Sequence, residues 1–331
     1  MSLIPDHPYL VSEAGGSLII TVPQLLTVNE ADAFRSFLEE RLNGAEGLKR
    51  LILDCAQTRM IDSSGVGSLV MLLRRCNQAG LAMELWSVND QLKLALSLAG
   101  LDQMLTLVDG SDAITQSTLD AVPERGSLTH PSVRCWPKRV IDVVGSGIGL
   151  VITALLFIPI AIAIRSEGKG PILFSQTRCG LMGRRFRLWK FRSMVTDAEA
   201  LKHTVTNQAS GAIFKNENDP RITRVGRFLR RTSLDELPQF WNVFIGDMSL
   251  IGTRPPTPDE VEIYNVPEWR RFDVRPGLSG EWQVYGRSKV TSFEDIIELD
   301  LRYQRRWSFS YDLRLIVRTF RVLLSKQSGA M

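Results

Sequence analysis

The most restrictive feature of this 331-residue sequence is an apolar stretch at positions 143–164 that contains no charged side chain. A membrane helix needs about 20 such residues, so this stretch is long enough to enter a bilayer. Basic residues flank it at both ends, with Lys138 and Arg139 before it and Arg165 and Lys169 after it. Because Lys and Arg concentrate on the cytoplasmic side of membrane segments, this symmetry predicts that both ends stay in the cytoplasm.

Pro159 lies inside the apolar stretch and removes one helical hydrogen bond, which predicts a kink or a break. A helix, a break and a second helix that enter and leave the same leaflet accommodate both the proline and the flanking charges. We therefore expect a re-entrant, monotopic membrane helix over residues 138–166. The alternatives are a simple kinked transmembrane helix and a buried core helix that contains three glycines.

The charged residues are divided unevenly around this stretch. Residues 1–131 carry 9 Lys and Arg against 16 Asp and Glu, whereas residues 132–331 carry 31 against 20. An acidic half joined to a basic half indicates two modules with different partners, and the basic half suits phosphate groups. The Pro- and Ser-rich residues 119–137 are typical of a linker between them.

Cysteine and histidine usage indicates no metal centre of the zinc type. The four cysteines form no CxxC pair and the three histidines show no zinc-site spacing, so we expect reduced thiols in the cytoplasm. The N-terminus lacks the basic start and apolar core of a signal peptide, so export is not expected.

Strand and helix patterns alternate in residues 1–118. Apolar runs rich in β-formers predict strands over 17–23, 48–55 and 81–87, and helical periodicity predicts helices over 29–44, 62–80 and 90–100. This alternation predicts an α/β fold, a small sheet with helices packed on one or both faces.

Residues 60–67, Met-Ile-Asp-Ser-Ser-Gly-Val-Gly, follow the second predicted strand. Together with the spacing of elements over 8–118, they resemble the signature of the STAS domain family of anti-sigma factor antagonists and transporter tails. The resemblance implies a docking module with a regulatory protein as partner. It also implies phosphorylation of Ser63, with Ser64 as the second choice, at a helix end that favours an anion. The alternative is that Ser63 only caps the helix.

The second half contains separate motifs in a distinctive order. They are KRVID (138–142), GP (170–171), KFRSM (190–194), NDPR (218–221), RRTSLDELPQ (230–239), GDMSLIGTRP (246–255), RPG (275–277) and ELD (298–300). In this order they resemble the bacterial sugar transferases of the monotopic phosphoglycosyl transferase superfamily. The resemblance implies a mainly helical α/β catalytic domain over 167–331 at the bacterial inner membrane, with both modules facing the cytoplasm. Its implied reaction moves a sugar 1-phosphate from a UDP-sugar to polyprenyl (undecaprenyl) phosphate, which initiates exopolysaccharide, capsule or other glycan assembly.

The residues themselves point to a phosphate site at Asp235 and Glu236. Ser233 and Glu236 have capping-box spacing, but Pro238 would then lie inside the helix at the cost of a hydrogen bond. A helix that starts at Asp235 or later avoids this conflict and puts both carboxylates at a helix end that can also hold a phosphate. Six arginines surround the pair in sequence, a pattern that favours phosphate binding over a passive surface. They are Arg221, Arg224, Arg227, Arg230, Arg231 and Arg254.

The resemblance also implies roles for individual residues. Asp235 is the implied nucleophile, which forms a covalent phosphosugar intermediate with release of UMP, and Glu236 is the implied ligand of Mg²⁺. Lys190 is implied as a further catalytic residue. Arg230 and Arg254 are implied as phosphate-binding cations and Asp300 as a supporting carboxylate. Further candidates for substrate or phosphate binding are Arg192, Arg221, Arg275 and Gln283. For each arginine the alternative is a solvated surface charge or a contact with a lipid headgroup.

Residues 310–326 form a basic amphipathic pattern. This pattern predicts either a helix in the membrane interface or one that closes the domain core.

A non-catalytic membrane scaffold with a STAS docking module is the alternative function. A transporter is not expected, because it would need many membrane segments and the sequence has one apolar stretch of that length. Nucleic-acid binding explains the basic half but not the adjacent membrane segment, so the expected partners are nucleotide sugar, polyprenyl phosphate and lipids.

Overall fold

The computed structural model describes the chain with a few gaps. The described residues are 9–14, 16–43, 47–108, 130–208, 216, 218–264, 266–286 and 292–324. They form two compact units, and the first comprises residues 1–129 together with 182–184 and 265–273, while the second contains the remainder. The first unit therefore includes two short segments that come much later in the sequence. Most of the predicted linker lies outside the described residues, and its last part forms α4 (Pro131–Arg134) and the start of α5.

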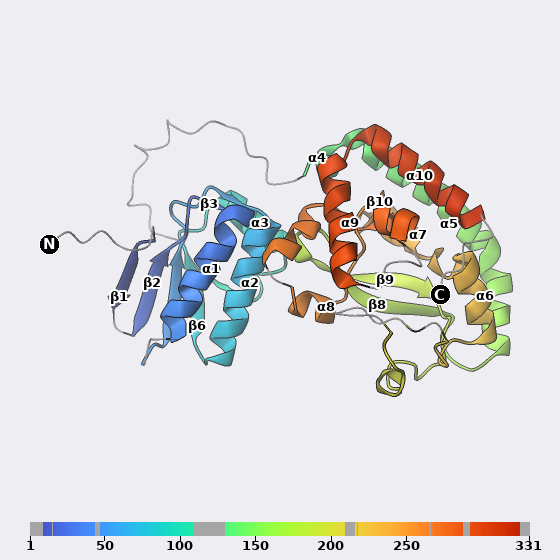
Figure 1. Ribbon diagram of the computed structural model, residues 1–331, viewed down its shortest axis with the longest axis horizontal. Coiled ribbons are helices and arrows are strands. Elements are labelled where there is room, and N and C mark those ends of the chain that lie inside the picture. The colour runs from blue at the N-terminus through green and yellow to red at the C-terminus, as the bar shows by residue number, and fades with distance from the viewer. Residues whose placement is uncertain are drawn as a thin grey trace. The chain divides into compact units, whose positions relative to one another are not determined.

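The first unit is built on a five-stranded sheet with the order β1-β2-β4-β6-β7 (Figure 1). The strands are β1 (Val11–Ala14), β2 (Ser17–Thr21), β4 (Arg50–Asp54), β6 (Ala82–Trp86) and β7 (Thr106–Val108). All neighbours pair in parallel except β1, which runs antiparallel to β2 at the edge. The parallel order follows from the alternation of strands and helices, because each parallel pair needs a crossover connection.

Three helices pack with this sheet, namely α1 (Val28–Asn43), α2 (Ser63–Gln78) and α3 (Asp90–Leu98). The short strands β3 (Leu25–Leu26) and β5 (Met60–Ile61) form a separate parallel pair before α2. The predicted α/β fold of this module is confirmed, and each strand and helix predicted within residues 17–100 is present with bounds shifted by one or two residues.

Asp62 caps α2, so the alternative that Ser63 serves as the cap is wrong. One carboxylate oxygen of Asp62 accepts a hydrogen bond from Gly65 N at 2.9 Å, and the other accepts one from Val28 N at 3.1 Å. Gly65 is needed here because a Cβ at this position would lie 2.0 Å from the carbonyl oxygen of Leu26. The cap leaves the hydroxyl of Ser63 available for other partners.

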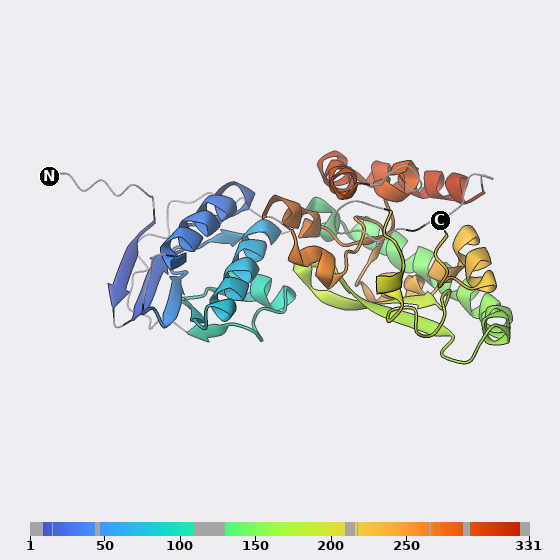
Figure 2. The ribbon, with the colours of Figure 1, turned by 60° about the horizontal axis from the view of Figure 1, so that its bottom comes forward.

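The second unit packs against one face of the long helix α5 (Trp136–Ser166). Two short sheets belong to it: β8 (Leu173–Cys179) with β9 (Arg185–Phe191), antiparallel, and β10 (Ser249–Ile251) with β11 (Gly277–Ser279), parallel. Its α-helices are α4, α5, α6 (Arg224–Thr232), α7 (Gln239–Ile245), α8 (Pro258–Glu262), α9 (Phe293–Arg306) and α10 (Phe309–Leu324). Short helical turns complete it, namely the 3₁₀ turns η3 (Lys202–Thr204) and η4 (Leu234–Glu236) and the π-helical η6 (Trp282–Gly286). The turns η2 (Leu181–Gly183) and η5 (Val266–Asp273) carry the late segments that join the first unit. Figure 2 gives a second view of these elements.

Helix α5 is continuous over 31 residues with Pro159 inside it, so the expected break between two helices is absent, whereas a kink and the re-entrant path stay predictions. Loss of one hydrogen bond and a steric clash at an interior proline cost about 3 kcal/mol. Packing offsets this cost, because Ile160 and Ile164 on the far side of the proline are buried against Phe191 and Leu229. Among the described residues, α5 is the one helix long and apolar enough to cross a membrane.

The two faces of α5 differ sharply. One face is buried against the rest of the unit, including α7 and α6, and presents polar or small residues such as Ser146, Gly149 and Thr153. The opposite face exposes a row of large apolar side chains: Val144, Ile148, Val151, Leu155, Ile158 and Ile162. Such a contiguous apolar face is typical of a surface that contacts lipid or another protein.

Candidate active site

The two adjacent carboxylates lie in the short turn η4, between helices α6 and α7. Ser233 ends α6 with a left-handed backbone, φ 58°, and its side chain makes no capping hydrogen bond. The chain then forms η4, and α7 starts at Gln239 with Pro238 as its N-cap. The acids therefore precede α7, and Pro238 occupies a position where its missing N–H costs nothing.

Two leucines on either side of the acids anchor this turn, Leu234 and Leu237. They pack against a buried cluster formed by Ile160, Ile164, Phe191 and Leu229. The hydroxyl of Thr153 in α5 also donates to the carbonyl of Leu237 at 3.2 Å. Because Phe191 follows Lys190 directly on β9, the same cluster fixes both the carboxylates and that lysine. Helix α5 is thus part of the support of the candidate site.

Lys190 and Glu236 form an ion pair, with 3.0 Å between Nζ and Oε1. Asp235 beside them is buried, with 6% of its surface exposed. Burial raises the pKa of the Asp235 carboxyl above its ordinary value, the positive charges of Lys190 and Arg230 oppose this shift, and Glu236 adds to it. A carboxylate held in a poorly solvated place between two cations is typical of a reactive group.

Arg230 extends the positive side of the site. Its Nε donates to Ser193 Oγ at 3.0 Å, and burial lowers the pKa of its guanidinium. Nearby, the guanidinium of Arg221 donates three hydrogen bonds to both carboxylate oxygens of Asp219, the shortest of them 2.7 Å, and this lowers the pKa of Asp219. Arg221 also donates to the carbonyl of Ala198. Its guanidinium therefore braces the loop before α6, and binding of substrate phosphate by Arg221 stays a prediction.

Arg254 and Asp300 meet in a second cluster. Asp300, 1% exposed, accepts the backbone N–H of Arg254 at 3.3 Å, which fits a supporting role. The Arg254 guanidinium pairs with Glu260 at 2.5 Å and lies over the ring of Trp282, 5.9 Å from its centroid. Arg178 approaches the same Glu260 at 3.9 Å. The cluster therefore sets two guanidinium groups, Arg178 and Arg254, against two carboxylates, Glu260 and Asp300.

The remaining predicted residues have other surroundings. Arg192 donates to the carbonyls of Ile164, Gly168 and Lys169, and so holds the C-terminal end of α5. Arg275 donates to the carbonyl of Val133 at 3.5 Å, and burial lowers the pKa of its guanidinium. Gln283 lies half-buried in η6. Substrate binding by these three residues stays a prediction.

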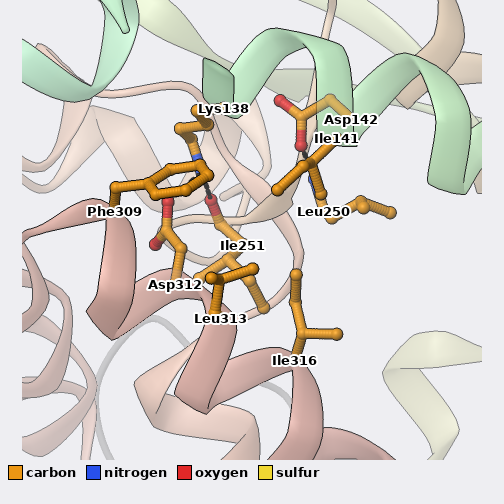
Figure 3. Close-up of a pocket in the computed structure, with 9 residues that line it drawn as sticks. All are labelled: Lys138, Ile141, Asp142, Leu250, Ile251, Phe309, Asp312, Leu313 and Ile316. Carbon is orange, nitrogen blue, oxygen red and sulfur yellow. Dashed lines mark hydrogen bonds and ion pairs between the residues drawn. The ribbon is translucent and has the colours of Figure 1, made fainter.

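A small cavity lies at the start of α5 (Figure 3), and none of its lining residues belongs to η4. In it Lys138 Nζ donates to Asp312 at 2.7 Å and to the carbonyl of Ile251 at 2.9 Å, and Asp142 accepts the N–H of Leu250. These bonds fasten α10 and β10 to α5, which gives the KRVID motif a structural role. The lining residues are Lys138, Ile141, Asp142, Leu250, Ile251, Phe309, Asp312, Leu313 and Ile316.

The carboxylates of η4 offer the minimum donor set for a magnesium ion. Within the described part of the chain, no group of three or more His, Cys, Asp or Glu side chains is arranged to hold a metal. Mg²⁺ is commonly bound through one or two carboxylates together with substrate phosphates and water. Asp235 and Glu236 fit an ion that arrives with a diphosphate, whereas they do not form a complete protein cage.

Sequence reasoning did not identify several partners of these residues. Ser193, Asp219 and Glu260 each bind a predicted arginine, yet none was a candidate. Ser193 lies inside the KFRSM motif and Asp219 inside the NDPR motif, and these positions could have identified both residues. Glu260 lies outside them, and only its contact with Arg254 reveals it.

Two profiles of known protein families match the chain. A family profile described as "Bacterial sugar transferase" matches residues 133–326, which include η4, Lys190 and the Arg254 cluster. The chain belongs to the bacterial sugar transferase family. A second profile, described as "STAS domain", matches residues 9–114, so both resemblances are confirmed.

Individual relatives match the transferase part. The chain is 50% identical over 189 residues to the galactosyl transferase CpsE of Streptococcus agalactiae, a match that covers 56% of the chain and 42% of CpsE. It is 40% identical over 199 residues to the undecaprenyl-phosphate galactose phosphotransferase of Salmonella typhimurium, covering 58% of the chain and 41% of that protein. The chain thus spans less than half the length of these relatives. The match to the exopolysaccharide production protein ExoY of Rhizobium meliloti, 33% identical, covers 62% of the chain and 94% of ExoY.

Solved structures resemble the first unit. One is a STAS domain protein of Planctomyces limnophilus, 19% identical, with a TM-score of 0.29 and coverage of 31% of the chain and 91% of that structure. Another is RsbS of Moorella thermoacetica, 17% identical, with the same TM-score and coverage of 31% and 88%.

Proposed function

We propose that the chain is a phosphoglycosyl transferase that moves a sugar 1-phosphate from a UDP-sugar to undecaprenyl phosphate and releases UMP. The observation that carries the proposal is the buried Asp235 of η4, adjacent to Glu236 and attracted by Lys190 and Arg230. Relatives named as undecaprenyl-phosphate galactose and glucose transferases support the substrate class. The product would start a membrane-linked glycan such as an exopolysaccharide or a capsule.

The reaction would proceed through two displacements at phosphorus. In the first, an Oδ atom of Asp235 attacks the sugar-linked phosphorus, and the bond from that phosphorus to the UMP oxygen breaks. In the second, an oxygen of undecaprenyl phosphate attacks the same phosphorus and the bond to Asp235 breaks, which regenerates the carboxylate. Covalent catalysis divides one difficult step into two easier ones.

The charges around Asp235 suit this attack. A carboxylate approaches an anionic diphosphate only if the negative charges are neutralised, and Lys190 and Arg230 supply two cations at that place. We include Mg²⁺ as a cofactor, with Glu236 as its protein ligand, and when bound it would neutralise phosphate charge. The second cluster around Arg254 would hold a more distant part of the substrate.

We also propose that α5 inserts in the bacterial inner membrane and that both units face the cytoplasm. The exposed apolar face of α5 supports insertion, and Arg139 near its start with Arg165 and Lys169 at its end support cytoplasmic ends. Lys138 does not contribute, because it is buried in its ion pair with Asp312. The apolar side chains exposed along α10, among them Val317 and Phe320, would add contacts in the membrane interface. The STAS domain would serve as a regulatory module, with Ser63 or Ser64 as its modified residue.

The decisive experiment measures UMP release from a panel of UDP-sugars by detergent-purified protein with Mg²⁺ and undecaprenyl phosphate. We expect release with one sugar and a loss of at least about 1,000-fold in Asp235→Asn, since the amide cannot act as the nucleophile. Incubation with UDP-sugar labelled at the sugar-linked phosphorus, without acceptor, should label the native protein and not the variant.

The matched control is Asp197→Asn, the same change at an exposed position. Undiminished UMP release by a folded Asp235→Asn protein would refute the assigned nucleophile. Absence of release with every sugar, from a folded protein in a competent lipid mixture, would favour the non-catalytic scaffold instead.

A further inference from the structure

The hydroxyl of Ser63 is enclosed by a segment that lies 210 positions later in the sequence. Ser63 Oγ lies 2.6 Å from Oδ1 of Asp273 and 2.7 Å from the carbonyl oxygen of Trp269, and Ser63 N donates to the same Oδ1 at 3.2 Å. Both residues belong to η5, which is part of the first compact unit. Ser63 has no exposed surface in this arrangement.

The ring of Trp269 fills a slot that two glycines leave open. A Cβ at Gly67 on α2 would lie 2.3 Å from this ring, and a Cβ at Gly183 would lie 2.9 Å from it. Phe272 meets the same ring edge-on, with 5.3 Å between centroids, and both aromatic side chains are buried. Helices α1 and α2 both pack against η5. The segment is therefore seated on α2 by shape as well as by hydrogen bonds.

Acidic groups dominate the charges around Ser63. Burial raises the pKa of Asp273 to about 6, and the nearby Asp62 adds to this, while the hydrogen bonds from Ser63 and the charge of Arg270 act in the opposite direction. Ser63 has a single hydroxyl proton but lies within hydrogen-bond distance of two acceptors. The arrangement tolerates a neutral hydroxyl and has no place for an additional anion.

We propose that residues 266–273 are the resident ligand of the N-terminal end of α2, and that a negative charge on Ser63 releases them. In phosphorylation by a protein kinase, the bond from Ser63 Oγ to the γ-phosphorus of ATP forms, the bond from that phosphorus to ADP breaks, and the hydroxyl proton passes to a base of the kinase. The phosphoryl group would add a charge of about −1.5 to −2 beside two acids. Because Ser63 is enclosed, the segment must also lift before a kinase reaches the hydroxyl. The STAS domain is thereby held by its own chain.

Release has a direct route to the transferase sequence. Asp273 is followed by Val274, Arg275 and Pro276 and then by β11, which pairs with β10. The carbonyl of Thr253, the residue before Arg254, accepts the N–H of Gly277 in that pairing. Release of η5 would therefore reach the Arg254 cluster through β11 and its partner strand β10. The release itself is a property of the fold and does not depend on the reaction proposed above.

The test compares hydrogen–deuterium exchange of the full-length protein in detergent with aspartate or asparagine at position 63. Ser63→Asp and Ser63→Asn have the same size, so only the charge differs between them. We expect amides 268–273 to exchange at least about tenfold faster in the aspartate variant, since like charges are being forced together in a buried place. Amides of β4 and β6 should keep their protection in both.

Two double variants identify the source of the repulsion. Adding Asp273→Asn to each of the two Ser63 variants should shrink the tenfold difference to about threefold or less, because one of the two facing acids is removed. Equal exchange of residues 268–273 in Ser63→Asp and Ser63→Asn would overturn the proposal, and so would a difference that survives Asp273→Asn in full.

Substitution of Ser63 in a buried place could unfold the whole unit, which loss of protection in β4 and β6 would reveal. Trp269→Ala then provides the second test, because it leaves α2 untouched. It should speed exchange in residues 268–273 and in the first turn of α2 while β4 and β6 stay protected. The control is Trp241→Ala, where the ring is 47% exposed on α7. Unchanged exchange in Trp269→Ala would refute the seating of the segment on α2.

Discussion

Substitution of Lys190 is the most direct way to change the charge of the candidate site. Its ammonium group pairs with Glu236 and favours ionisation of the buried Asp235. In Lys190→Met this attraction is lost, so the pKa of Asp235 rises further. Because the ionised carboxylate is the attacking form, the acidic limb of kcat/KM should move to higher pH by about one unit. The pH profile of UMP release measures this shift.

The matched control for this shift is Arg187→Met, which removes an exposed cation from the same strand. Its acidic limb should coincide with that of the native protein. A Lys190→Met enzyme that loses rate equally at every pH would show instead that the lysine acts on the substrate and leaves the ionisation of Asp235 unchanged.

Contacts at residue scale were predictable from the sequence only where a motif carried both partners. The sequence alone predicted the Asp235–Glu236 pair and the arginines near it. In the structure, β9 brings Lys190 to this pair through the shared cluster around Phe191. The bond from Ser63 to Asp273 could not be predicted, because the motif around Ser63 does not point to Asp273 and 210 positions separate the two residues. Long-range side-chain pairs of this kind arise only from tertiary packing.

At the scale of elements, α5 offers two glycines with opposite surroundings. A Cβ at Gly149 would lie 2.4 Å from the ring of Phe240 on α7, whereas a Cβ at Gly147 would meet nothing within 4 Å. Gly149→Ala should therefore force α5 and α7 apart and cost about 1–3 kcal/mol. Gly147→Ala should be neutral or stabilise the helix by up to about 1 kcal/mol.

Thermal unfolding of both variants in the same detergent measures the difference. We expect a lower Tm for Gly149→Ala, and a lower rate of UMP release as well, because α5 supports η4 through Thr153 and Ile160. Equal Tm values for the two variants would mean that α5 and α7 do not pack closely in the detergent-bound protein.

Element prediction from sequence succeeded where periodicity ran over several residues. The parallel strands and the helices of the first unit have clear patterns, but the short edge strands β1 and β7 were not predicted, since so few residues carry little signal. At Pro159 the sequence predicted a break that the helix does not have. The effect of the proline on the backbone is local, and burial of Ile160 and Ile164 lets the helix continue past it.

At the scale of the whole molecule, the first unit contains residues from three parts of the sequence. Removal of residues 1–118 takes away α1 and α2, against which η5 packs, and so exposes Trp269 and Phe272. Each buried aromatic side chain is worth about 1.5–3 kcal/mol. The truncated chain should therefore bind a hydrophobic dye and unfold at a lower temperature than the full-length protein.

Basal transfer should nevertheless persist in the truncated chain. ExoY, a relative of which the matched region makes up 94%, indicates that the transferase part stands nearly alone elsewhere. Adding Trp269→Ser and Phe272→Ser to the truncation should reduce dye binding without further loss of UMP release. A soluble, folded truncation with no UMP release would make the first unit an essential part of the catalytic fold.

The inclusion of η5 in the first unit also bears on protein synthesis. The ribosome completes β7 at Val108 long before it reaches Asp273, and at about 5–20 residues per second the interval is roughly 10–30 s. Throughout that time the sheet and α2 can form, but the face that receives Trp269 has no occupant. A nascent chain would therefore present Ser63 and the Gly67 slot to chaperones and modifying enzymes, which would lose access once residues 266–273 have left the ribosome and bound α2.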